Sequence, residues 1–132
     1  ALKKYSDTTS VIFLEESLHG DKLKTARRLF TEKIITSLPD VIITSNDLIA
    51  QGIISAAHEN GINIPNDMQI TGFDDSLSSA YFIPSVTTVS QNIDELAKRC
   101  FSMLMDLINK KSSVSSIIEQ NIIARNSAKI NI

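Results

Sequence analysis

The chain has 132 residues, of which 42% are hydrophobic and 21% are charged, and its formal net charge at pH 7 is −2. This length allows one compact domain with its own hydrophobic core and is too short for two. Proteins that dock on nucleic acid usually cluster lysines and arginines on one face to neutralise phosphates. Here the cations are scattered, and the densest group, from Lys22 to Arg28, fits the solvated side of a helix. Direct binding of this chain to nucleic acid is therefore disfavoured.

Neither a disulfide scaffold nor a membrane span is indicated. Cys100 is the single cysteine, and its apolar neighbours Ala97, Phe101 and Leu104 predict a small buried hydrophobic residue. The apolar runs fall well short of the length that crosses a bilayer. No signal peptide opens the chain, and residues 1–5 read like the last turn of a helix. We therefore expect the chain to be part of a longer protein.

The first part of the chain alternates β-type runs with helical patterns. Val41–Thr44 is a continuous run of the kind expected for a strand buried on both faces of a parallel sheet. Strands and helices that alternate with short connections predict an α/β domain with a parallel sheet. The predicted elements are a strand over 11–14, a helix between its N-cap Asp21 and Pro39, a strand over 41–44, a helix over about 47–60 and a strand over 68–73.

The pattern changes after the third strand. Residues 74–85 lack a clear periodicity, and Val86–Val89 is predicted to be extended. The clearest helix of the chain spans Ile93–Ile108, and Asn92 has the position of the N-cap in a capping box. Residues 117–123 could form a final strand.

Polar groups follow three of the predicted strands. They are Glu15 and Glu16, then Ser45-Asn46-Asp47, then Asp74-Asp75. In open α/β sheets the ligand lies beyond the carboxyl ends of the strands, so these groups should gather along one edge. A carboxylate accepts two hydrogen bonds at once, and this edge suits a neutral ligand with many hydroxyl or N–H groups. A phosphate is disfavoured because the sequence offers no glycine-rich loop or nearby cation.

Each of these residues also has a structural interpretation. Asn46 or Ser45 can cap the following helix, and Asp47 can favour the helix dipole as a first-turn carboxylate. Asp75 can cap a turn, which leaves Asp74 as the better ligand candidate. Magnesium and calcium need several oxygen ligands at defined spacings, and no such loop is present, so we predict no metal site.

Catalysis has little support in the sequence. His19 precedes a glycine in a loop, and His58 lies near the end of a predicted helix, where a solvated side chain is usual. An enzyme of the nucleophilic type would need a nucleophile and a base within reach of each other. The sequence identifies no such pair, so we expect neither an enzyme nor a bound cofactor.

A series of short motifs runs from Pro39 to Ser127. They are Pro39-Asp40-Val41, Ser45-Asn46-Asp47, Ala50 with Gly52, Gly61, Ile64-Pro65-Asn66-Asp67, Gly72-Phe73-Asp74-Asp75, the run from Pro84 to Gln91, and Arg125-Asn126-Ser127. In their order and spacing these motifs resemble the effector-binding domain of the LacI/GalR transcription regulators. Any one of the motifs would be a weak signal, whereas the whole series is specific.

The resemblance implies a periplasmic-binding-protein-like I fold, which is Rossmann-like, with two α/β lobes and a sugar or small metabolite bound between them. Asn46, Asp74 and Gln91 match positions that commonly contact the effector in this family. Glu16, or less closely Glu15, would match another contact region through a looser motif.

The resemblance also implies partners. The family forms homodimers, partly through the helix over 47–60 and the loop around 80–82, so Ile53, Tyr81 and Phe82 are expected at a dimer interface. DNA would be bound only by a helix-turn-helix that this chain lacks, and no membrane partner is expected. The resemblance implies a cytoplasmic regulator whose effector controls DNA binding. The alternative is an exported sugar-binding protein of a transport system, and the full-length N-terminus would distinguish the two.

The family pattern divides the chain into segments. Residues 1–8 would be the tail of a first lobe that is absent here. Residues 9–86 and 115–128 would form the C-terminal lobe. Residues 87–112 would cross over and supply a helix to the other lobe, so that half of the binding cleft is missing from this chain.

Overall fold

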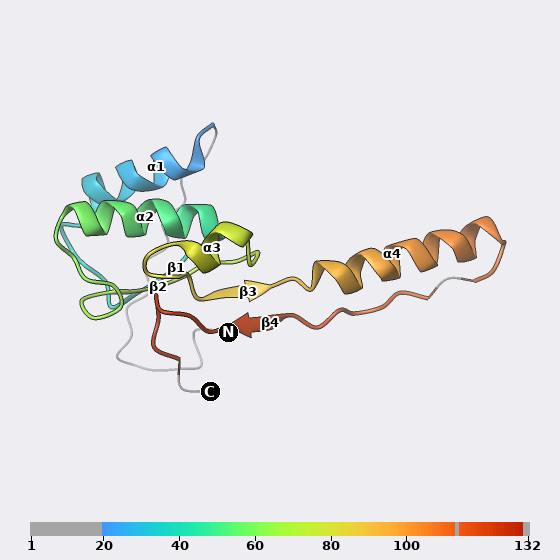
Figure 1. The fold of residues 1–132 in the computed structure, drawn as a ribbon. Coiled ribbons are helices and arrows are strands. Elements are labelled where there is room, and N and C mark those ends of the chain that lie inside the picture. Colours follow the sequence, from blue (N-terminus) through green and yellow to red (C-terminus); the bar gives the residue numbers. More distant parts are fainter. Residues whose placement is uncertain (1–19, 113, 131–132) are drawn as a thin grey trace, which may run out of the picture.

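The computed structural model describes residues 20–112 and 114–130, which form a rounded body and an arm that projects from it (Figure 1). The predicted strand over 11–14, together with Glu15 and Glu16, lies outside the described residues. Among the described residues, no helix combines the length and the apolar character that crossing a membrane requires.

The body begins with helix α1 (Lys22–Leu29), which continues without a break into a short π-helix, η2 (Phe30–Ile34). The side chain of Asp21 accepts a 3.1 Å hydrogen bond from the backbone N–H of Lys24, as predicted for an N-cap. The buried residues of this segment recur at helical spacing and face one side: Ala26, Leu29, Phe30 and Ile34.

Helix α2 (Asp47–Glu59) lies between α1 and the sheet (Figure 1). Its bounds agree with the prediction to within a residue, and Gly61 follows with a φ of 75°. A Cβ atom at Gly52 would lie 2.6 Å from the carbonyl oxygen of Leu23 and 2.8 Å from Cβ of Ala26, so only glycine allows the two helices to pack this closely. The core of the body is the cluster formed by Ala26, Leu29, Phe30, Ile34, Ile49, Ala50, Ile53, Ile54, Ala56, Ala57, Met68, Ile70 and Val86.

Strands β1 (Val41–Ile43) and β2 (Gln69–Thr71) pair in parallel, with Ile42 opposite Ile70. A single parallel bridge between Thr71 and Thr87 extends this sheet on the other side of β2. The α/β class with a parallel sheet is therefore confirmed. However, Val41 and Ile43 of β1 are 48% and 74% exposed, so β1 is not buried on both faces as predicted. Among the described strands, β1 pairs with β2 alone.

Residues 74–85 contain a short helix, α3 (Leu77–Tyr81), which the sequence pattern did not reveal. Five residues are too few to display a helical period, and only Ser79 of this helix is buried.

The arm consists of β3 (Thr88–Ser90), α4 (Ile93–Ile108) and β4 (Asn121–Ile123). Strands β3 and β4 are antiparallel, and they join the arm to the body (Figure 1). The predicted helix and final strand are thus present, although the strand is shorter than the predicted range of 117–123.

Two expectations about the arm are wrong. Cys100 is exposed, because α4 projects from the body and has no buried residue within the described structure. Asn92 does not cap α4 through its side chain, since its backbone is left-handed with a φ of 52°. A capping side chain acts from an extended backbone, so this conformation directs Asn92 away from the first turn.

Candidate functional site

The segments that follow β1, β2 and β3 meet at one edge of the sheet. The backbone N–H of Asp47 donates to the carbonyl oxygen of Phe73 over 2.9 Å, and that of Asp74 donates to Val89 over 3.0 Å. The polar groups after β1 and β2 therefore lie beside each other and beside β3. The structure supports the geometric expectation that the strand ends form a common polar edge.

Asp74 and Gln91 are in direct contact at this edge. The side-chain amide of Gln91 donates a 2.5 Å hydrogen bond to Oδ1 of the Asp74 carboxylate. Asp74 is exposed and has a φ of 107°, a region that residues with side chains rarely occupy. Such backbone strain is concentrated at functional sites, where the surrounding contacts hold it in place. The structure thus brings together two of the predicted ligand residues.

Asn46 acts as the N-cap of α2. Its Oδ1 accepts a 3.0 Å hydrogen bond from the backbone N–H of Ile49. Its side chain is partly exposed, and it lies one residue before the backbone contact that joins α2 to Phe73. The capping role is confirmed, while contact of Asn46 with an effector stays a prediction.

Asp47 has a structural role. Its carboxylate is 1% exposed and accepts hydrogen bonds from the hydroxyl of Thr88 at 2.5 Å and from the backbone N–H of Ser76 at 2.7 Å. A Cβ atom at Gly72 would collide with this carboxylate, so glycine is required there. A buried carboxylate with hydrogen-bond donors on both oxygens is well satisfied. Asp47 therefore fixes the segment beside Asp74 and is not open to a ligand.

Asp75 forms an ion pair with Arg125 instead of capping its own turn. The distance from Nη2 of Arg125 to Oδ1 of Asp75 is 2.5 Å, and the two side chains are 17% and 26% exposed. The partners are 50 residues apart in the sequence, so local spacing gives no sign of this pair. The only sequence signal was indirect, since both residues belong to motifs of the family resemblance.

The remaining predicted site residues lie elsewhere. Glu16 is outside the described residues. Ile53 is 2% exposed and belongs to the core of the body, so its side chain is not on the surface of this chain, and its place at a dimer interface stays a prediction. Tyr81 is 78% exposed, whereas Phe82 packs partly against the core.

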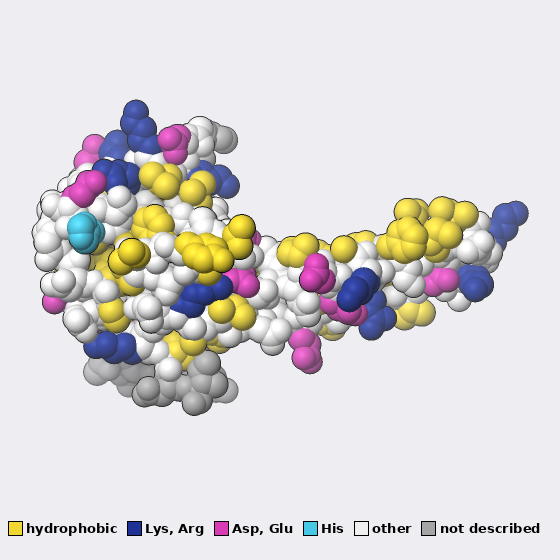
Figure 2. Space-filling view, viewed as in Figure 1, with side chains coloured by type: hydrophobic (Ala, Val, Ile, Leu, Met, Phe, Trp, Pro, Cys, Tyr) yellow, Lys and Arg dark blue, Asp and Glu magenta, His cyan; other side chains and the backbone are white. Residues whose placement is uncertain are grey.

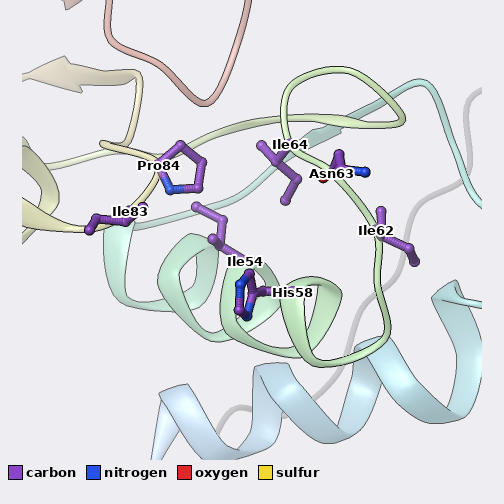
Figure 3. A pocket seen from close by; sticks show the side chains of 7 residues that line it. All are labelled: Ile54, His58, Ile62, Asn63, Ile64, Ile83 and Pro84. Atoms are coloured by element: carbon purple, nitrogen blue, oxygen red, sulfur yellow. The ribbon is translucent and has the colours of Figure 1, made fainter.

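A pocket of about 230 Å³ lies beside the second half of α2 (Figure 3). Its walls come from α2 and two loops, and the lining residues are Ile54, His58, Ile62, Asn63, Ile64, Ile83 and Pro84. Ile54, the first α2 residue that lines the pocket, follows Asn46 by eight residues, which is roughly 12 Å along the helix at 1.5 Å per residue. The lining is mainly apolar, so the pocket does not offer the polar groups that a sugar needs.

Metal binding finds no support in the part of the chain that the structure describes. Across residues 20–112 and 114–130, no three side chains of His, Cys, Asp or Glu come together in a group that could hold an ion. Asp74 and Asp75 are adjacent, but Asp75 is already paired with Arg125.

Comparison with protein-family models identifies the family of this chain. The periplasmic binding protein-like domain matches residues 6–128, which is nearly the whole chain. The chain belongs to this family of domains.

Known relatives narrow the resemblance to transcription regulators. The HTH-type transcriptional repressor PurR of Pasteurella multocida is 35% identical over 95 residues, which cover 70% of this chain and 28% of the repressor. The solved ribose operon repressor from Lactobacillus acidophilus is 30% identical with a TM-score of 0.77, over 89% of this chain and 44% of that protein. A LacI family regulator from Enterococcus faecium with bound ribose is 26% identical with a TM-score of 0.73, over 80% and 40% of the two chains.

These similarities confirm the predicted periplasmic-binding-protein-like fold and the resemblance to the effector-binding domain of LacI/GalR regulators. The chain spans 28% of the length of the Pasteurella repressor and 44% of the Lactobacillus one.

Proposed function

We propose that this chain is the effector-sensing part of a cytoplasmic LacI-type transcription regulator, and that it binds a small neutral sugar at the polar edge of its sheet. Asp74 carries the proposal, because it combines an exposed carboxylate, a left-handed backbone and a hydrogen bond to Gln91 at the carboxyl end of a parallel strand. Two of the similar solved structures also support a sugar ligand. One is named a ribose operon repressor, and the other is a LacI family regulator with bound ribose.

The chemistry of the edge suits a polyol. A carboxylate offers about four lone-pair positions, and Gln91 uses one of those on Asp74. The rest can accept hydrogen bonds from adjacent hydroxyl groups, and such bonds to a charged acceptor are strong. An amide group both donates and accepts, so Gln91 complements the mixed donors and acceptors of a sugar ring.

The relatives are transcriptional repressors rather than enzymes, in agreement with the expectation that this chain catalyses no reaction. In the proposed regulator, DNA is bound by a separate helix-turn-helix, and effector binding changes DNA affinity. This coupling requires the effector to prefer one arrangement of the lobes, as all allosteric control does.

The arm fits the proposed division of the chain. Residues 87–112 leave the body through β3 and form α4, whose apolar side chains are exposed along its length (Figure 2). An amphipathic helix usually buries its apolar face, so we assign residues 87–112 to the first lobe of the intact regulator.

A homodimer is the other part of the proposal. Tyr81 and Leu77 of α3 and the adjacent Ile83 are 78%, 79% and 87% exposed, and they form an apolar patch, the α3 patch, on the body. Apolar side chains gather on the face of the body that carries α2 and α3 in Figure 2. Large exposed apolar groups in a contiguous patch often mark an interface, and we place the dimer contact there.

A thermal-shift screen of the full-length protein against sugars, polyols and nucleosides tests the proposed function. A ligand that binds only the native state raises the melting temperature, and its effect grows with concentration. We expect a pentose or related sugar to produce such a shift. A shift with nucleosides alone would reject the sugar assignment, and the absence of any shift across the screen would reject the sensor assignment for these ligand classes.

A further inference from the structure

The loop that carries Asp74 needs support from outside itself. Asp74 and Asp75 have φ angles of 107° and 52°, so two consecutive residues with side chains occupy the left-handed region. This conformation is unfavourable for residues with side chains, and it persists only where neighbouring groups impose it. The groups that impose it also decide where the Asp74 carboxylate is held.

One side of the loop is held by β3. The backbone N–H of Asp74 donates to the carbonyl oxygen of Val89 over 3.0 Å, and that of Asp75 lies 3.4 Å from the hydroxyl of Thr88. The second of these contacts is long for a hydrogen bond and is correspondingly weak. The β3 contacts therefore fix Asp74 better than they fix Asp75.

Arg125 holds the other side. Its Nη2 pairs with Asp75 at 2.5 Å, its Nη1 donates to the carbonyl oxygen of Val86 at 2.9 Å, and its backbone N–H donates to the hydroxyl of Thr87 at 2.9 Å. A planar guanidinium can hold two acceptors at fixed relative positions, which an ammonium group cannot do. Arg125 follows β4, so it joins the loop to the strands that enter and leave the arm.

We propose that Arg125 is a positioning residue of the effector site, which fixes the Asp74 carboxylate against Gln91 by holding Asp75 and Val86 at the same time. The proposal rests on the proposed function, because it assigns Asp74 and Gln91 to the binding of a sugar. Arg125 acts through Asp75 and does not itself contact the ligand. An ion pair with only a structural role would affect folding and leave the site unchanged.

The variant R125Q tests this distinction with two readouts. The first is the affinity of the full-length protein for D-ribose, measured by calorimetry well below the melting temperature. The second is the side-chain amide signal of Gln91 in the NMR spectrum of the ligand-free chain, which reports its hydrogen bond to Asp74. R27Q is the matched control, because it removes the Arg27–Glu59 ion pair, at 2.7 Å, on the α1–α2 surface far from the loop.

We expect R125Q to weaken D-ribose binding at least roughly tenfold, the loss that a hydrogen bond to a charged group represents. The Gln91 amide signal should move toward its position in an unfolded peptide. R125K should give an intermediate result, since it keeps the charge opposite Asp75 and loses the simultaneous contact with Val86. R27Q should change neither readout.

The outcomes distinguish the positioning role of Arg125 from the proposed sugar-binding function. Unchanged D-ribose affinity and an unchanged Gln91 signal in R125Q would overturn the positioning role while leaving the proposed function intact. If the wild-type protein does not bind D-ribose but the Gln91 signal still moves in R125Q, the positioning role is supported and the proposed ligand is rejected. A fall in melting temperature with neither readout changed would make Arg125 a structural residue only.

Discussion

The hydroxyl of Thr88 donates a 2.5 Å hydrogen bond to the buried carboxylate of Asp47, and so ties the first turn of α2 to the strand that leads into the arm. The same carboxylate accepts the backbone N–H of Ser76, just after the Asp74–Asp75 loop. One acid therefore holds together the segments that surround the candidate site.

Replacing Asp47 with alanine should lower the free energy of unfolding by about 3 kcal/mol, because the Thr88 hydroxyl and the Ser76 N–H would both be buried without an acceptor. Urea denaturation measures this change. D94A is the matched control, since Asp94 is also an acid in the first turn of a helix but is exposed. It should change stability little. Equal losses in D47A and D94A would show that only the helix dipole matters at both positions.

Gly72 and Thr88 should be coupled through Asp47. G72A places a methyl group against the Asp47 carboxylate and should cost about 2 kcal/mol. T88V removes the hydroxyl donor and should cost about 2 kcal/mol as well. If G72A already displaces the Asp47 carboxylate from Thr88, the double variant G72A/T88V will lose clearly less stability than the sum of the two single losses. Additive losses would contradict the shared dependence on Asp47.

The sequence predicts the local parts of this structure well. The caps at Asp21 and Asn46 and the bounds of α2 follow from short-range patterns, and the alternation of strands with helices predicts a parallel sheet. The backbone contact between the segments that follow β1 and β2, from Asp47 to Phe73, follows from the general geometry of parallel sheets.

What the sequence does not predict depends on distant partners. The pattern of α4 shows that one face is apolar, but it does not show whether another element covers that face, so Cys100 was wrongly placed in a core. Ile53 was expected at an interface only through the family resemblance, and the pattern of α2 does not show that this side chain is packed in the core of the body. The Asp75–Arg125 pair spans 50 residues, beyond any local signal.

The α3 patch should control dimer formation. Y81D places a charge in the centre of the proposed contact and should raise the dimer dissociation constant at least roughly tenfold in sedimentation experiments. V114D is the control, because Val114 is equally exposed, at 78%, but lies beyond α4. A wild-type protein that is monomeric at all concentrations, or a dimer that tolerates Y81D as well as V114D, would remove the α3 patch from the proposed interface.

The rate at which Cys100 is labelled shows whether another part of the protein covers helix α4. In the 132-residue chain the thiol is exposed, so a thiol reagent should label it nearly as fast as in the urea-unfolded chain. In the full-length protein, where we assign α4 to the first lobe, labelling at Cys100 should be at least roughly tenfold slower. Mass spectrometry of the labelled peptide gives both rates. Equal rates in the two proteins would contradict the assignment of α4 to the first lobe.

The sugar affinity of D74A in the full-length protein tests the central claim most directly, namely that the polar edge of the sheet binds a small neutral sugar. Calorimetry with D-ribose should show a loss of roughly a hundredfold, because the charged acceptor of several hydroxyl groups is gone. The melting temperature of the ligand-free protein should fall by only a few degrees, since Asp74 is exposed and the only cost is that alanine tolerates its left-handed backbone less well than aspartate. Wild-type affinity for D-ribose in D74A would contradict the account.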